Sequence, residues 1–86
     1  MLKVYALTED FYVEGVLNES GKLVGIFSNN EKAKNQMTKI IQYHGRTEVL
    51  FHEVAEMVIT DTGGFIRGKG NGKEIRLSFR IEEYDI

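Results

Sequence analysis

The sequence predicts an α+β fold in which one helix, at roughly 29–44, packs across one face of a mostly antiparallel sheet of four to five strands. Three observations lead to this prediction: short segments rich in β-branched and aromatic residues, one amphipathic helical stripe, and a glycine-rich turn signal near the C-terminus. With 86 residues, the chain has room for a single domain, 1–86. A core this small gives marginal stability, which self-association would increase.

The first third of the chain predicts strands. Residues 2–8, LKVYALT, are rich in β-formers and are interpreted as a first strand. The NESG stretch at 18–21 is a turn signal, so we expect a strand over 11–17 to pair with one over 22–28. Residues 22–28, KLVGIFS, are apolar on both faces, which predicts a central, well-covered strand.

The helix has the clearest local pattern. Ser28 and Glu31 match a capping box, with Ser28 as the N-cap and Glu31 at position N3. Gly45 stands where a left-handed residue commonly ends a helix. One apolar stripe follows the helical spacing and consists of Ala33, Met37, Ile40, Ile41 and His44.

Residues 48–60, EVLFHEVAEMVIT, fit two structures. A helix would place its polar residues on one arc, whereas a strand would place Val49, Phe51, Ala55, Met57 and Ile59 on one face, with Glu53 as the exception. The β-branched residues and the following TDTGG favour a strand over 55–60. The sequence leaves 48–54 open between helix and strand.

The stretch GGFIRGKGNGK, residues 63–73, has the spacing of a phosphate-binding loop up to Gly68-Lys69. Gly70 stands where that loop needs Ser or Thr, and glycines rather than a helix follow. A β-hairpin explains the stretch better, because Asn71-Gly72 is a preferred pair for a type I′ turn. We therefore expect no nucleotide site and no cofactor.

The turn fixes which side chains of this hairpin face the core. A turn at Asn71-Gly72 pairs Arg67 with Arg76, whereas a turn at Gly70-Asn71 pairs Arg67 with Glu74 and keeps the same faces. The sequence leaves both registers open. Either register points one apolar set inward: Ile66, Ile75, Leu77, Phe79 and Ile81.

The opposite face of the hairpin carries the candidate binding residues, which are basic or aromatic. With Glu74 and Ser78 nearby, such a face resembles a platform for single-stranded nucleic acid or an acidic partner. A solvated face balanced by the acidic blocks elsewhere is the favoured interpretation, since the chain has a net charge of −2. One such block is 48–61, which has four acids and no lysine or arginine. The candidate binding residues are Phe65, Arg67, Lys69, Arg76 and Arg80.

No catalytic or metal-binding pattern stands out. His44 lies on the apolar stripe and is interpreted as structural, and His52 has no second histidine at metal-binding spacing. Glu82, Glu83 and Asp85 on a terminal strand are poorly placed for acid–base chemistry. We therefore expect a protein that is not an enzyme.

The chain has no cysteine, no apolar leader at its N-terminus and no apolar run long enough to span a membrane. These features predict a cytoplasmic protein that does not bind membranes.

Three motifs carry a family resemblance: KVYAL at 3–7, the strand-to-helix junction GIFSNNEKA at 25–33, and FRIEEY at 79–84. The chain resembles small uncharacterised bacterial and phage proteins with a K-V-Y-x-L start, a G-I-F-S-x-x-E-x-A junction and an F-x-I-x-E-Y end. The resemblance implies a sheet-plus-helix unit of prophage origin with no known activity, in which 46–74 is an insertion.

Together with the absence of catalytic groups, these observations predict a non-enzymatic protein-interaction module. We expect it to form a homodimer or to bind a larger protein partner, with nucleic-acid binding through the basic face as the alternative.

Overall fold

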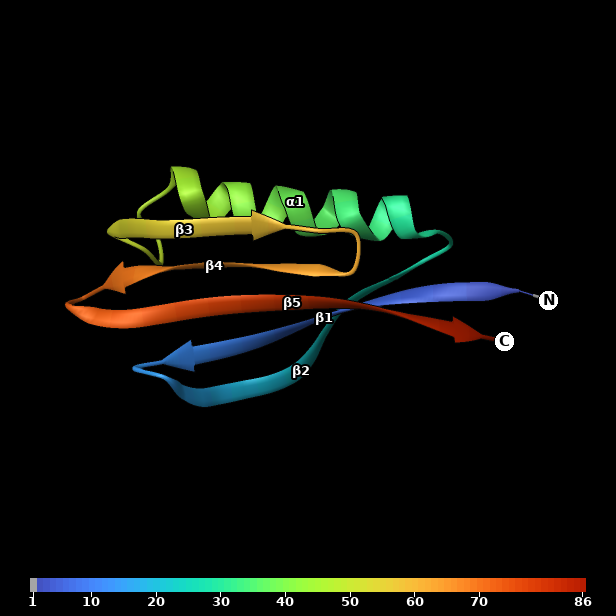
Figure 1. Ribbon diagram of the computed structural model, residues 1–86, viewed down its shortest axis with the longest axis horizontal. Coiled ribbons are helices and arrows are strands. Elements are labelled where there is room, and N and C mark those ends of the chain that lie inside the picture. The colour runs from blue at the N-terminus through green and yellow to red at the C-terminus, as the bar shows by residue number, and fades with distance from the viewer. Residues whose placement is uncertain (1) are drawn as a thin grey trace.

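One twisted antiparallel sheet and one helix make up the computed structural model, which describes residues 2–86 (Figure 1). The strands lie in the order β2-β1-β5-β4-β3, and each neighbouring pair is antiparallel. The predicted α+β fold with one helix is confirmed, and the sheet has five strands. In chain order the elements are β1 (Lys3–Val13), β2 (Val16–Phe27), α1 (Asn30–Arg46), β3 (Glu53–Ile59), β4 (Gly63–Gly70) and β5 (Lys73–Asp85).

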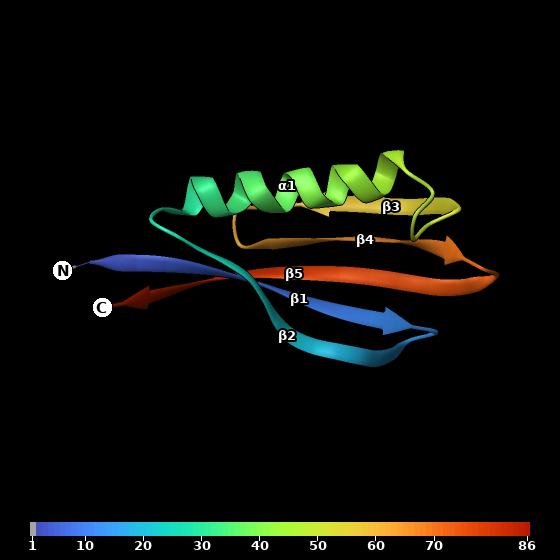
Figure 2. The ribbon, with the colours of Figure 1, turned by 180° about the vertical axis from the view of Figure 1, so that it is seen from behind.

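The helix covers only one face of the sheet. In Figures 1 and 2, α1 runs along the side of the sheet formed by β3 and β4, and β2 forms the opposite border. The helix nevertheless contacts all five strands. Because β2 lies farthest from the helix axis in both views, its residues from 16 to 23 are exposed on both faces of the sheet.

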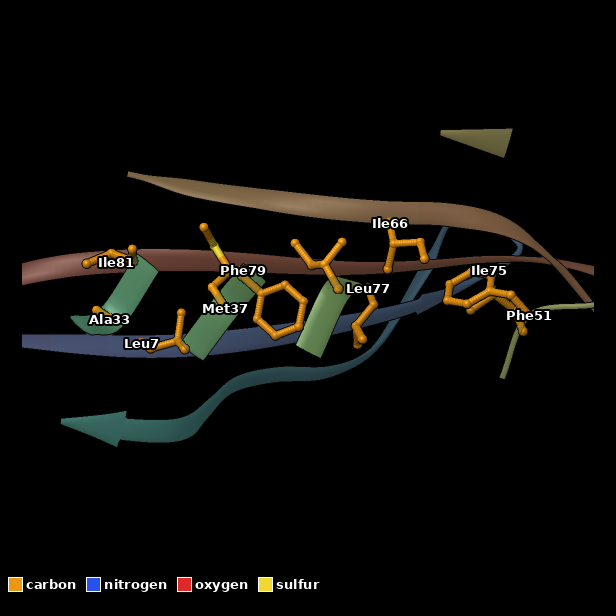
Figure 3. Packing of buried hydrophobic residues seen from close by; sticks show 10 residues of the cluster. Leu7, Ala33, Met37, Phe51, Ile66, Ile75, Leu77, Phe79 and Ile81 are labelled. Atoms are coloured by element: carbon orange, nitrogen blue, oxygen red, sulfur yellow. The ribbon is translucent and has the colours of Figure 1, made fainter. Parts of the chain in front are cut away.

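The core lies between α1 and the middle of the sheet. Alternate side chains of β5 are buried, as the period of two for a strand requires. Figure 3 shows these side chains in one row along β5, with those of the helix packed onto them. The predicted core face of the second hairpin is therefore confirmed. The buried cluster comprises Leu7, Ala33, Met37, Ile41, Phe51, Ile66, Ile75, Leu77, Phe79 and Ile81.

The helix begins one residue later than the predicted capping box implies. Asn29 is the N-cap, and its side-chain oxygen accepts a hydrogen bond from the backbone N–H of Lys32 at 2.8 Å. The prediction of Ser28 as the N-cap is wrong, because its hydroxyl instead accepts a hydrogen bond from Lys32 Nζ at 3.3 Å. An asparagine caps as well as a serine does, so adjacent candidates cannot be separated by residue type.

Gly45 does not end the helix, which continues to Arg46 and is capped by Thr47 in an extended conformation. The predicted left-handed glycine is therefore wrong. A side chain at Gly45 would meet Met57 Sδ of β3 at 2.7 Å. The lack of a side chain at position 45 therefore allows α1 to pack closely against β3.

The first hairpin differs from the prediction. A single strand, β1, continues through Val13, and the chain turns at Glu14-Gly15, both of which have positive φ angles of 51° and 77°. The NESG stretch lies inside β2, where Gly21 (φ 65°) accompanies an irregular register. Gly21 donates its N–H to Asp10 Oδ1 at 2.7 Å, so this turn signal belongs to a β-bulge.

Of residues 48–54, which were open between helix and strand, 48–52 form a loop, and 53–54 are the start of β3. The predicted strand over 55–60 is confirmed, with β3 at Glu53–Ile59. A bulge between Val54 and Glu56 breaks the simple alternation. The predicted common face is therefore wrong, because the pairing puts Val54 opposite Gly68 on the helix side and skips Ala55.

Candidate interaction surface

The face of the sheet turned away from α1 is called the outer face here. On β5 it carries the even-numbered side chains from Glu74 to Tyr84, because the odd-numbered ones from Ile75 to Ile81 are buried against the helix. Directly paired residues on neighbouring strands share a face, so the strand register assigns the rest of the surface. The outer face has two parts: a charged part over β3–β5 and an apolar part over β1 and β2.

The second hairpin adopts the Asn71-Gly72 register. Both turn residues have positive φ angles, 53° and 77°, as a type I′ turn requires. Arg67 pairs with Arg76, and Lys69 pairs with Glu74. This register brings all five candidate binding residues to the outer face: Phe65, Arg67, Lys69, Arg76 and Arg80.

Carboxylates hold two of the four basic side chains. Arg67 Nε lies 2.8 Å from Glu56 Oε1, which comes from the adjacent strand β3. Arg80 Nε lies 2.9 Å from Glu82 Oε1, two residues along β5. Both ion pairs are exposed, so each contributes little to stability, but each offsets the charge of its arginine.

Arg76 makes a different set of contacts. Its guanidinium lies over the ring of Phe65, with Cζ 4.3 Å from the ring centroid, and its Nε donates to Ser78 Oγ at 2.9 Å. A cation over an aromatic ring within about 6 Å is an attractive arrangement. The repulsion expected between the paired Arg67 and Arg76 is relieved because one turns to Glu56 and the other to Phe65.

A shallow groove crosses this charged part of the outer face. It carries basic and acidic groups side by side, so it has no single sign of charge. The polar side chains that line it are Tyr12, Glu53, Arg67, Lys69, Glu74, Arg76 and Ser78. Beyond the groove, the outer face also carries Asp10, Glu56, Glu82 and Arg80. The whole face therefore holds five acids and four bases. The favoured interpretation, a balanced face, fits this arrangement better than a basic platform does.

Three large apolar side chains of β2 form what we call the apolar strip: Leu17, Leu23 and Ile26. They are 46%, 55% and 61% exposed. Their partners in the register are Tyr12, Thr8 and Ala6 of β1, which places all three on the outer face. Sequence reasoning missed this strip, because it interpreted the apolar run at 22–28 as a covered central strand. The polar residues NES at 18–20 were the signal for an edge strand.

The two histidines do not form a site with other groups. His44 is half-buried at the core margin, where its ring makes edge contacts with Tyr43 and Phe51. Burial lowers the pKa of His44 and outweighs the nearby Glu9, which acts to raise it. His52 lies in the loop before β3. Within residues 2–86, no group of three His, Asp or Glu side chains is arranged to hold a metal ion.

The acidic residues of the C-terminal strand face opposite ways. Glu83 lies on the helix side, where it accepts a hydrogen bond from Tyr5 Oη at 2.8 Å and pairs with Lys3. These contacts, Tyr5 first, lower the pKa of Glu83, and the hydrogen bond to Glu83 raises the pKa of Tyr5. Glu82 belongs to the outer face and pairs with Arg80. The two carboxylates therefore do not converge on one substrate position.

Comparison with protein-family models, curated proteins and solved structures gave no significant match. The resemblance to prophage proteins thus stays a prediction. The described part of the chain contains no helix with both the length and the apolar character needed to cross a membrane.

Proposed function

We propose that this protein is a non-catalytic protein-interaction module that forms a homodimer through its apolar strip. The observation that carries the proposal is the exposure of Leu17, Leu23 and Ile26 together on a sheet face that no helix covers. Scattered single apolar residues on a surface need no explanation, whereas neighbouring ones mark an interaction site. Leu23 and Ile26 lie opposite Thr8 and Ala6, which are adjacent on the outer side of β1, and Leu17 lies two outer-face positions farther along, opposite Tyr12. We propose a cytoplasmic location and a prophage origin alongside this role.

The geometry of sheets supports a second copy as the occupant. Two twisted sheets stack face to face about 10 Å apart, with alternate side chains of each filling the space between them. Leu17, Leu23 and Ile26 alternate along β2 in the way this packing needs, apart from the bulge. Burying them in a dimer would add about 1.5–3 kcal/mol for each side chain that becomes fully covered. A small domain with one helix and a half-open sheet gains from that addition.

Charge also favours self-recognition over an oppositely charged partner. The outer face carries four bases and five acids, interspersed over four strands. Two such faces related by a two-fold axis can align acids of one copy with bases of the other, because a two-fold interface is self-complementary. A strongly basic or acidic partner would meet repulsion at half of these positions.

The test is sedimentation of the protein as a function of concentration. The unmodified chain is expected to sediment as a dimer, and the double variant Leu23→Glu with Ile26→Glu as a monomer of unchanged secondary structure. Leu2→Glu with Ile86→Glu is the matched control, because these residues are also exposed but lie away from the strip. A monomer at every concentration, or an equal loss of dimer in the control, would refute the proposed dimer.

Nucleic-acid binding through the charged part of the outer face is our second proposal. The stack of Arg76 on Phe65 favours it, because single-stranded nucleic acids bind to aromatic rings and arginine planes. We expect an oligonucleotide to be retained at low salt and released steeply as salt is added. Arg76→Glu with Arg80→Glu should abolish retention. Failure to bind at low salt, or unchanged binding by the variant, would reject this function.

A further inference from the structure

Strand β3 is an edge strand whose far side has no partner among residues 2–86. The hydrogen bond from Thr60 N–H to Gly63 O, at 2.8 Å, fixes which groups of β3 point to β4. Hydrogen-bonded and non-hydrogen-bonded pairs alternate along an antiparallel ladder. The N–H and C=O groups of Met57 and Ile59 therefore point away from β4, toward the open edge.

The other edge of the sheet is less suited to pairing. The register between β1 and β2 is irregular at three places, and the Gly21 N–H is already bound by the Asp10 side chain. Bulges of this kind protect edge strands from pairing with another chain. In β3 the register is regular from Glu56 to Ile59. Of the two edges, β3 offers the regular ladder.

The side chains of β3 give this edge a definite chemistry. On the helix side, Val54, Met57 and Ile59 remain 37%, 49% and 37% exposed. On the outer side, Glu53 and Glu56 lie beside Lys69 and Arg67 of β4. The segment 48–61 contains four acids and no lysine or arginine; Arg67 pairs with Glu56, and Lys34 with Asp61. Glu53, where β3 begins, lies opposite Lys69 but forms no ion pair within residues 2–86, so its carboxylate can accept a basic side chain of a partner.

We propose that β3 binds an extended peptide segment of a partner protein, in which apolar side chains alternate with lysine or arginine. Added as a sixth strand, the peptide would hydrogen-bond to the outward groups of Met57 and Ile59. Its apolar side chains would cover the helix side of β3, and its basic side chains would lie beside Glu53 on the outer side. This edge is separate from the apolar strip on β2, so peptide binding and dimer formation can succeed or fail independently.

Three short fluorescent peptides test the proposal by anisotropy: one alternates valine with lysine, one alternates valine with glutamate, and one has the first composition in two blocks. The alternating basic peptide is expected to bind at least about tenfold more tightly than either of the others, since both the hydrogen-bonded strand and the charge pattern are needed. Equal binding of the acidic or the block peptide would overturn the proposal.

Two measurements test whether the peptide binds at β3: the affinity of variants substituted in β3, and amide hydrogen exchange in the unmodified protein. Met57→Pro removes an N–H that points to the open edge without removing a hydrogen bond to β4. It should lower the affinity for the basic peptide about tenfold. Glu53→Lys should also weaken it, whereas Glu19→Lys on β2 is the matched control and should not. In the unmodified protein, hydrogen exchange at Met57 and Ile59 should slow when the peptide is present. Unchanged exchange there would overturn the proposal even if Met57→Pro does not fold.

The same experiments distinguish another occupant of the edge. If Glu53→Lys changes the sedimentation of the protein alone, a second copy pairs with β3 and the peptide proposal is wrong. If it leaves sedimentation unchanged while peptide binding falls, the edge is a peptide site as proposed.

Discussion

His44 has the least satisfied polar side chain in the described structure. Its Nδ1 is buried and has no hydrogen-bond partner, although its ring packs well against Tyr43 and Phe51. A buried polar atom without a partner costs free energy, and charging the ring there costs more. The spacing of the apolar stripe correctly predicted that His44 faces inward, but it could not predict how far its nitrogen atoms would be removed from water.

The pKa of His44, lowered by burial, makes the stability of the protein depend on pH. The unfolded chain binds a proton at this residue at higher pH than the folded chain does. The stability that depends on neutral His44 is therefore fully present above the pKa of about 6.5 in the unfolded chain, and it is lost as the pH falls below that value. We expect the free energy of unfolding in urea to be lower at pH 5.5 than at pH 8.

Replacement of the histidines checks the origin of that effect. His44→Phe should reduce the loss of stability between pH 8 and pH 5.5, because the variant has no proton to bind at this position. His52→Gln is the matched control and should keep the full loss. If both variants behave like the unmodified protein, His44 is not the cause.

At the scale of the elements, the two hairpins use the same kind of turn with different residues. The turn of the second hairpin is Asn71-Gly72 and that of the first is Glu14-Gly15, and all four residues have positive φ angles. Asparagine tolerates the left-handed conformation better than glutamate does. This difference explains why the second turn was predictable in register and the first was not: Glu14 gives no turn signal, and NESG gives a false one.

Exchanging these turn residues should shift stability in opposite directions. Glu14→Asn is expected to stabilise the protein by about 0.5–1 kcal/mol, and Asn71→Glu to destabilise it by about 1 kcal/mol, because only the left-handed residue changes. Urea unfolding of both variants measures the difference. Equal stability of both variants and the unmodified protein would mean that the turns do not strain their central residues.

Local patterns predicted the elements better than they predicted the environment of each element. The helix and the second hairpin depend on contacts within a few residues, such as the cap at Asn29 and the pair Asn71-Gly72, and such contacts are visible in the sequence. The position of β2 at the border depends on the strand order, which brings β5 beside β1. That order is set by packing between distant segments, so the apolar run at 22–28 taken alone could not predict the exposure of Leu23 and Ile26, and only the polar residues at 18–20 pointed to it.

At the scale of the whole molecule, the layout leaves one face of the sheet without a covering layer. Its charged part was predicted residue by residue from the register of β4 and β5, while the acids that neutralise it come from β3 and β1 as well as β5. Its apolar part lies on β2, at the border farthest from α1 in Figure 1. The strip and the open edge of β3 thus lie at opposite borders of one sheet, where two different contacts can form together.

The central claim is that a second copy covers the apolar strip, and amide NMR spectra recorded over a dilution series test it most directly. On dilution from dimer to monomer, the amides of Leu17, Leu23 and Ile26 are expected to shift, together with those of their neighbours on β1. The amides on the exposed side of α1 should stay in place. Spectra that do not change with concentration, or changes confined to α1, would contradict the claim.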